Sequence, residues 1–320
     1  MPAMSNTSGP QGRAVQAVPP GGDARLDWER DGADWPNRAA SRFVTAGGLR
    51  WHVQVMGQGP VLLLLHGTGA STHSWRDLTP MLAKDFTVVA PDLPGHGFTA
   101  MPASRGLSRP GLSRPGLSLP GMAGLVRALL DELGYEPEFA AGHSAGAAIL
   151  VRLCIDQAIR PQRLVALNGA LLPLGGLAGM IFSPMAKVLA GMNRVPHFFA
   201  RCAESPGMVQ RLLHDTGSRL DATGTAFYSR LARSPGHVAA ALGMMAEWDL
   251  YALRRDLPRL RTPLHLIVGG SDGTIPPADA FRIKSLLPRT QVKYLRGLGH
   301  LAHEEAPAQV ALLIRTMAGL

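Results

Sequence analysis

Residues 142–146, Gly142-His143-Ser144-Ala145-Gly146, decide how the rest of the chain is interpreted. This G-x-S-x-G motif follows a β-rich run at 137–141 and precedes a helical pattern at 145–157. A serine at such a sharp turn has unfavourable backbone dihedral angles, and the flanking glycines remove side chains that would collide there. The turn exposes the hydroxyl and points the positive end of a helix at the reacting atoms. The motif therefore predicts that Ser144 is a nucleophile.

A serine hydroxyl is a weak nucleophile until a base takes its proton, so a histidine is expected later in the chain. Among 11 histidines, His300 in GLGHLAHEEAP is best placed, because it follows the last predicted strand. His303 lies one helical turn later and is the competing candidate. Histidines in glycine-rich turns near the serine, His66, His96 and His143, are expected to have structural roles.

The third group should be a carboxylate that fixes the imidazole tautomer. Asp272, in GGSDGTIPP directly after the run PLHLIVGG, has this position. The other place for the acid is the end of the preceding strand, where the sequence has Asn168, and a neutral amide cannot balance an imidazolium. The order Ser144, Asp272, His300 is that of the α/β-hydrolase fold.

The expected oxyanion hole lies in HGTG, residues 66–69, at the end of the first buried strand. The amides of Thr68 and Ala145 are the expected donors. Loss of one such donor typically lowers the rate ~10²–10³-fold.

The fold class expected around these motifs is α/β. Residues 41–55 indicate a hairpin, and buried strands alternate with helices after it, which favours parallel βαβ units. We expect the α/β-hydrolase fold, with a mostly parallel twisted sheet, helices on both faces and a helical lid between two core strands. Strands are expected in these ranges: 60–65, 86–90, 137–143, 163–169, 263–270 and 291–297.

Three parts of the chain differ in composition. Residues 1–25 are rich in Pro, Gly and Ser and are interpreted as a flexible tail. Residues 26–170 and 259–320 are expected to form the core. Residues 171–258, rich in Met, Pro, Phe and Gly, are expected to form the helical lid over a pocket.

A local repeat interrupts the core. GLSRP occurs at 106–110 and 111–115, and GLSLP follows at 116–120. Such a Pro/Gly-rich duplication is expected to form an exposed loop that packs no core. Ser118 is expected to cap the next helix, which should end at Gly134.

Composition excludes several classes of protein. The 320 residues are 46% hydrophobic and 17% charged, which predicts a globular, water-soluble protein. The formal net charge of +9 comes mostly from scattered arginines, which favours a solvated surface, and no nucleic-acid partner is expected. An anionic partner, such as a membrane surface or a carboxylate-bearing ligand, is the alternative. The sequence has no run of eighteen apolar residues, so no transmembrane segment is expected. The two cysteines, Cys154 and Cys202, indicate a reducing cytoplasm, and neither a metal site nor a cofactor is expected.

The chain from residue 34 onward resembles the magnesium-chelatase accessory proteins of bacteriochlorophyll synthesis, which are α/β-hydrolase homologues of photosynthetic bacteria. Five stretches carry the resemblance: WERDGADWPNRAASRFV at 28–44, PDLPGHGFT at 91–99, SLPGMA at 118–123, GHSAGAAI at 142–149 and LGHLAHEE at 298–305. It implies a role near magnesium insertion into protoporphyrin, and transient contact with magnesium chelatase.

The resemblance directs attention to a broad apolar pocket that could take a tetrapyrrole. Arg194, Arg201 and Arg211 are candidate partners for porphyrin propionates. The candidate pocket residues are His66, Gly67, His143, Met180, Met185, Phe198, Phe199, Met244 and Trp248.

Three functions remain open from sequence. The first is a serine hydrolase acting on an apolar substrate; serine at position 144 argues against haloalkane dehalogenases and epoxide hydrolases, which use aspartate there. The second is a porphyrin-binding or chelatase-docking protein without turnover. The third is a generic carboxylesterase unconnected with pigment synthesis.

Overall fold

The computed structural model describes residues 25–103, 115–173, 194–205 and 207–320. Most of the expected tail, most of the first two pentapeptide repeats, and the candidate pocket residues Met180 and Met185 lie outside the described residues.

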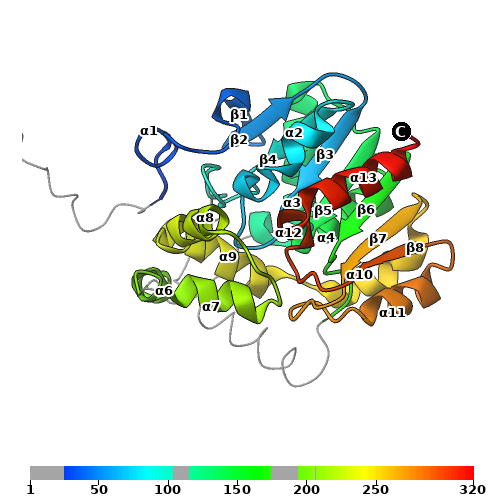
Figure 1. The fold of residues 1–320 in the computed structure, drawn as a ribbon. Helices are drawn as coiled ribbons and strands as arrows, with labels where there is room; N and C mark the ends of the chain where they lie inside the picture. Colours follow the sequence, from blue (N-terminus) through cyan, green and yellow to red (C-terminus); the bar gives the residue numbers. More distant parts are fainter. Residues whose placement is uncertain (1–24, 104–114, 174–193, 206) are drawn as a thin grey trace, which may run out of the picture.

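An eight-stranded sheet in the order β1-β2-β4-β3-β5-β6-β7-β8 forms the centre of the molecule (Figure 1). β2 runs antiparallel to β1 and β4, and the other neighbours are parallel. The expected mostly parallel sheet is confirmed. The strands are β1 (Ser41–Ala46), β2 (Leu49–Met56), β3 (Val61–Leu65), β4 (Thr87–Pro91), β5 (Phe139–His143), β6 (Arg163–Leu167), β7 (Leu264–Gly269) and β8 (Gln291–Leu295).

Helices cover both faces of this sheet, as expected. On one face lie α3 (Leu119–Leu133), α4 (Ala145–Ile155), α10 (Leu250–Asp256) and α11 (Asp279–Leu286). On the other lie α2 (Leu78–Leu82), α12 (Ala302–Glu305) and α13 (Pro307–Ala318). The remaining helices are α1 (Trp28–Asp31), α6 (Val195–Cys202), α7 (Met208–Asp215), α8 (Ala222–Ala232) and α9 (Pro235–Glu247), with 3-10 turns at Arg38–Ala40, Thr72–Trp75, Pro115–Leu117 and Leu257–Arg259.

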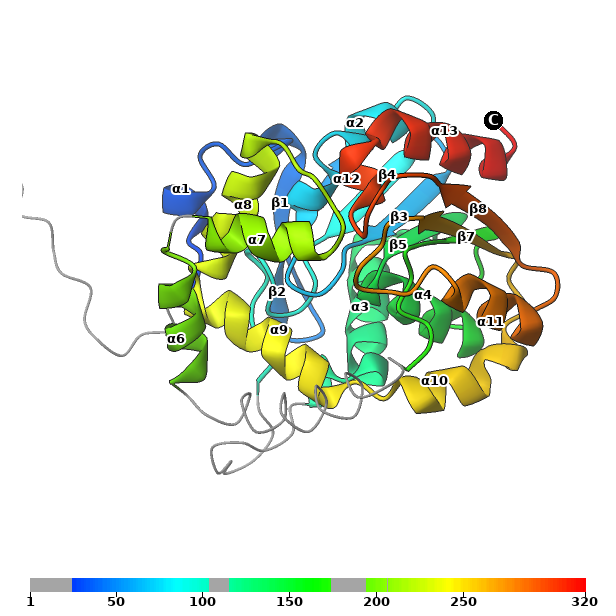
Figure 2. The same cartoon turned by 60° about the horizontal axis from the view of Figure 1, so that its bottom comes forward.

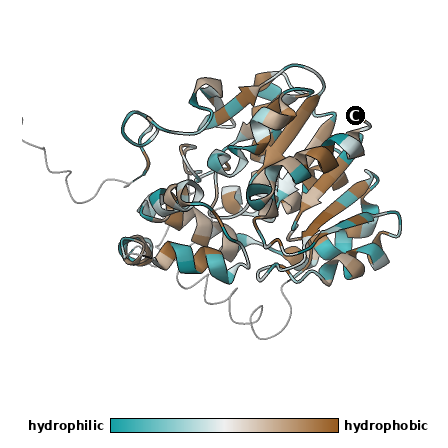
Figure 3. Ribbon diagram, viewed as in Figure 1, coloured by the Kyte–Doolittle hydropathy of each residue, from teal (hydrophilic) through white to brown (hydrophobic). Residues whose placement is uncertain are grey.

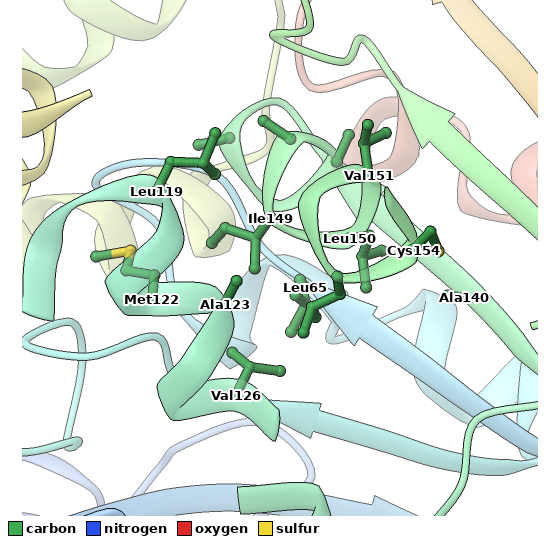
Figure 4. Packing of buried hydrophobic residues seen from close by; sticks show 14 of the residues in the cluster. Leu65, Leu119, Met122, Ala123, Val126, Ala140, Ile149, Leu150, Val151 and Cys154 are labelled. Carbon is green, nitrogen blue, oxygen red and sulfur yellow. The ribbon is translucent and has the colours of Figure 1, made fainter. Parts of the chain in front are cut away.

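The consecutive leucines of β3 show why the central strands are hydrophobic throughout. Leu63 and Leu65 join the cluster formed with α3 and α4, whereas Leu62 and Leu64 join the cluster formed with α2 and α13. Alternate side chains of a strand point to opposite faces, so a strand covered twice must be apolar at every position. Figure 3 shows the resulting apolar strands, and Figure 4 shows Leu65 packed against α4.

The last pentapeptide repeat corrects one expectation. Leu117 and Leu119 are buried in the core, and α3 begins at Leu119. The repeat at 116–120 therefore packs against the core, because its two leucines face inward while Ser118 caps the helix with a 3.2 Å bond from the amide of Gly121. The helix ends at Gly134, whose φ of 70° is one that favours glycine.

The helices α6–α10 form an insertion between β6 and β7, as expected for this fold class. Of its described helices, α6–α9 lie together beside one end of the sheet, whereas α10 packs against α4 (Figures 1 and 2). No helix among the described residues is long and apolar enough to span a membrane.

The turn after β4 is organised by a fully buried carboxylate. Asp92 accepts hydrogen bonds from the amides of Thr72 (2.7 Å) and Phe98 (2.9 Å), and its Oδ2 lies 2.8 Å from His52 Nδ1. His52 is therefore the group that ties β2 to this turn. Despite burial, these partners hold the pKa of Asp92 well below its ordinary value.

We expect Asp92→Asn to lower the free energy of unfolding by about 3 kcal/mol, because an amide cannot replace a buried ionised carboxylate that accepts three bonds. Urea denaturation at pH 7 measures the change. Asp131→Asn is the matched control, since Asp131 is largely exposed and forms a surface ion pair with Arg127; it should change stability by less than about 0.5 kcal/mol. Equal effects of the two variants would contradict this account.

Candidate active site

The backbone at Ser144 turns sharply between β5 and α4. Ser144 has φ 50° and ψ −114°, which places a non-glycine residue at positive φ. A Cβ on Gly146 would lie 2.1 Å from the carbonyl oxygen of Leu65, and one on Gly142 would lie 2.5 Å from the amide nitrogen of Ala147. Only glycine fits at both places, so α4 can approach β3 and β5 closely enough to hold the turn.

Asp272 and His300 are brought together by the loops that follow β7 and β8. Asp272 Oδ2 lies 2.8 Å from His300 Nδ1 and accepts a 2.6 Å bond from Asn168 Nδ2. Asp272 Oδ1 accepts bonds from the amides of Thr274 (2.7 Å) and Ile275 (2.9 Å). Four donors on one carboxylate fix its orientation, and the carboxylate in turn fixes the imidazole with Nδ1 as its donor.

Asn168, at the excluded acid position, and His303, the competing candidate for the base, both have other contacts. Asn168, at the second acid position, donates to Asp272 and so supports the acid. His303 is buried, with Nε2 2.8 Å from Ser74 Oγ and its ring 4.7 Å from that of Trp75. Burial lowers the pKa of His303 to about 3.

The expected oxyanion donors lie beside Ser144. Ala145 is the first residue of α4, so its amide has no acceptor within the helix. Thr68, Ser144 and Ala145 line one cavity together with His300. A Cβ on Gly67 would lie 3.1 Å from Ser144 Cβ, so the strand end that carries Thr68 packs directly on the serine.

His143, the residue before the serine, is bonded to the loop that carries His300, which we call the base loop. Its Nε2 lies 2.9 Å from the carbonyl oxygen of His300, which can only accept, so His143 is the donor. The two rings are 4.6 Å apart. Burial holds the pKa of His143 well below its ordinary value, so the ring is neutral and its donor position is fixed.

A short loop of the insertion, residues 216–218, is hydrogen-bonded to the loop that carries Asp272 (the acid loop) and to the base loop. We call residues 216–218 the clasp loop. The carbonyl oxygen of Thr216 accepts from the amides of His300 (3.2 Å) and Gly273 (3.0 Å), and Ser218 Oγ accepts from the amide of Leu301 (2.8 Å). The sequence analysis missed this loop. Its one signal is a glycine between two helical patterns, which does not reveal its partners.

Two cavities meet at Ser144. Both are lined by Thr68, Ser144, Thr216 and His300. The narrow cavity, about 370 Å³, has an apolar wall from the insertion: Phe199, Met208, Val209, Leu212, Leu213, Val238, Ala241 and Leu242. The wide cavity, about 660 Å³, extends towards α10 and is lined by Met245, Trp248, Tyr251, Glu247 and Asp249.

The structure separates the expected pocket residues. His143 and Phe199 line the narrow cavity and Trp248 the wide one. The other four described candidates, His66, Gly67, Phe198 and Met244, line neither. His66 and Met244 are fully buried, Gly67 lies beneath His143 and Ser144, and Phe198 is 63% exposed on the outer surface of α6.

Arg194, Arg201 and Arg211 are exposed, and none of them lines either cavity. The charged residues that do line the wide cavity, Glu247 and Asp249, are acidic. The described walls thus do not offer the expected arginines to porphyrin propionates. His237, which the sequence analysis overlooked, lines the narrow cavity and bonds the carbonyl oxygen of Gly69 at 3.1 Å.

Comparison with known proteins agrees with this architecture. Residues 62–312 match the alpha/beta hydrolase family, and the chain belongs to that family. The "Magnesium-chelatase 30 kDa subunit" of Rhodobacter capsulatus is 40% identical over 279 residues, which cover 86% of this chain and 93% of that protein. The expected resemblance to magnesium-chelatase accessory proteins is confirmed.

More distant relatives share the fold or a part of the chain. An alpha/beta hydrolase fold protein from Burkholderia ambifaria superposes with a TM-score of 0.71 at 22% identity, covering 86% of this chain and 97% of that one. A soluble epoxide hydrolase from Corynebacterium sp. (strain C12) is 35% identical over 121 residues, 38% of this chain and 38% of that protein. The first likeness concerns the fold alone.

We expect His143→Phe to slow reaction of Ser144 with a fluorophosphonate at least ~10-fold, because the loop carrying His300 loses its buried donor and the base is displaced. His143→Gln keeps a donor and should react within about threefold of the wild type. Rates measured from pH 5 to 9 test the assignment. An equal loss in both variants, with an unchanged pH profile, would show that His143 only fills space.

Seven buried histidines make stability sensitive to acid. Burial lowers their pKa values, to about 4 for His237 and about 3 for His303. In the unfolded chain such a histidine binds a proton near pH 6.5, whereas in the folded protein it stays neutral to a lower pH. Its contribution to the free energy of unfolding is therefore complete above pH 6.5 and is lost as the pH falls. The seven are His66, His73, His96, His143, His237, His265 and His303.

We expect His303→Gln to reduce the slope of unfolding free energy against pH, between pH 6 and 4, by about 1.4 kcal/mol per pH unit. Urea denaturation at three pH values gives the slope. His214→Gln is the control, since His214 is exposed, and it should leave the slope unchanged. A slope unaffected by His303→Gln would refute the assignment.

Proposed function

We propose that this protein is a serine hydrolase of bacteriochlorophyll synthesis, with Ser144, Asp272 and His300 as its triad and an apolar, tetrapyrrole-like molecule as its substrate. The observation that carries the proposal is the 2.8 Å contact between His300 Nδ1 and Asp272 Oδ2 beside cavities that also expose Ser144. The 40% identity to a protein named as a magnesium-chelatase subunit supports the assignment to this pathway. A cytoplasmic location goes with this proposal.

In the proposed reaction each of these groups has one role. His300 Nε2 takes the proton of Ser144 Oγ as the oxygen attacks the carbonyl carbon of an ester. The amides of Thr68 and Ala145 donate to the oxygen that becomes negative. The proton passes from His300 to the departing alcohol, and the acyl group stays on Ser144. A water molecule deprotonated by His300 then releases the acid and restores the serine.

We also propose that residues 171–258 act as a lid over both cavities, with residues 26–170 and 259–320 as the core. The lid supplies most of the apolar wall of the narrow cavity. Such a wall removes water from the reacting atoms and favours an apolar substrate. The acidic residues of the wide cavity disfavour an anionic group on that side.

A second candidate function is an accessory protein that binds a tetrapyrrole or contacts magnesium chelatase without turnover. It is favoured by the name of the Rhodobacter capsulatus relative, which describes a subunit of that enzyme. A generic carboxylesterase is the third candidate. It requires the same triad and differs only in substrate.

Reaction with a fluorophosphonate probe tests the proposal directly. We expect the wild-type protein to be labelled and Ser144→Ala to remain unlabelled. Asp272→Asn should be labelled about 10³–10⁴-fold more slowly, because the imidazole loses its tautomer and its counter-charge. Protoporphyrin or its magnesium form should slow labelling of the wild type by occupying the cavities.

The controls separate the three candidates. Circular dichroism establishes that the variants are folded. A folded wild-type protein that binds protoporphyrin but is never labelled would support the accessory protein and exclude the hydrolase. Rapid labelling that no porphyrin slows, with cleavage of short acyl esters, would support the carboxylesterase.

A further inference from the structure

Three large apolar side chains are exposed together on α6 and α7. Phe198 is 63%, Leu212 55% and Phe199 36% exposed. We call these three residues the apolar patch. Isolated apolar residues on a surface are ordinary, but a group of bulky ones on adjoining short helices marks an interaction site. We propose that the apolar patch docks the protein on a lipid bilayer that carries anionic headgroups.

The two helices are amphipathic, and their inward faces are already occupied. Pro196 and Ala200 of α6 are buried, and α6 packs against α9. Val209 and Leu213 of α7 are buried in a cluster with Leu301. The patch is therefore the outer face of helices whose inner faces pack on the protein. Figures 1 and 2 both show α6 at the periphery of the molecule.

The patch continues into the narrow cavity, which favours a bilayer over another partner. Phe199 and Leu212 are exposed and also line the cavity that reaches Ser144. They therefore stand at its mouth. An apolar molecule dissolved in a bilayer that touched this mouth could enter the apolar cavity without crossing water.

Charge complements an anionic surface. Arg194, Arg201 and Arg211 are exposed on the same segment, against two exposed acids, Glu204 and Asp215. The local excess is one positive charge, and the whole chain carries +9. Apolar insertion should thus provide most of the affinity, and anionic headgroups should add to it through the arginines.

Sedimentation with phospholipid vesicles tests the proposal. We expect the wild-type chain to bind vesicles of phosphatidylcholine mixed with phosphatidylglycerol, and to bind pure phosphatidylcholine more weakly. The double variant Phe198→Ser/Leu212→Ser should reduce the partition coefficient at least ~10-fold, because it removes the two most exposed apolar side chains of the patch. No binding by the wild type would overturn the proposal, as would equal binding to both vesicle types.

Phe281→Ser is the matched control, because Phe281 on α11 is 66% exposed but lies away from α6 and α7 (Figure 2). It should bind vesicles as the wild type does, and so should Ser144→Ala, since docking needs no turnover. Loss of binding in Phe281→Ser equal to that of the double variant would overturn the assignment of the patch. Light scattering tests whether the apolar patch instead binds a second copy of the chain. A wild-type dimer that does not bind vesicles, and that Phe198→Ser/Leu212→Ser dissociates, would also overturn the proposal.

Discussion

The backbone of Ser144 is held at φ 50° by the close approach of α4 to β3 and β5, and the rest of the site is arranged around that turn. Such a conformation is unfavourable for serine by itself. It persists because Gly142 and Gly146 allow backbone contacts that any Cβ would prevent. The position of the serine is thereby fixed by the sheet and not by a mobile loop, and the neighbouring strand ends supply the other groups.

Those groups come from segments far apart in the sequence. Thr68 follows β3, Asn168 follows β6, Asp272 follows β7 and His300 follows β8. Parallel strands deliver their carboxyl ends to one edge of the sheet, so each loop contributes one polar group, a side chain or a backbone amide, to the same place. The insertion leaves the sheet at this edge as well, which is why its apolar helices wall the cavity beside Ser144.

Local signals in the sequence predicted the fold and the sharp turn at Ser144, whereas contacts between distant segments were harder to predict. The strand-turn-helix around Ser144 and the doubly covered β3 are visible in a few adjacent residues. The donor role of Asn168 depends on a partner 104 positions away. Phe198 was expected in the pocket because it is aromatic, yet the face of α6 that packs inward is that of Pro196 and Ala200. Amino-acid composition alone does not indicate which face of a short helix packs against its neighbour.

The clasp loop joins the insertion to the acid and base loops through the bonds of Thr216 and Ser218. A Cβ on Gly299 would lie 2.3 Å from the carbonyl carbon of Gly217, so the two segments also touch closely. Unfolding of the insertion would leave the amides of Gly273, His300 and Leu301 without their acceptors, and unfolding of the base loop would leave Thr216 and Ser218 without their donors. The two segments are therefore expected to unfold together. A change in the length or sequence of this insertion would therefore act on the support of Asp272 and His300 as well as on the wall of the narrow cavity.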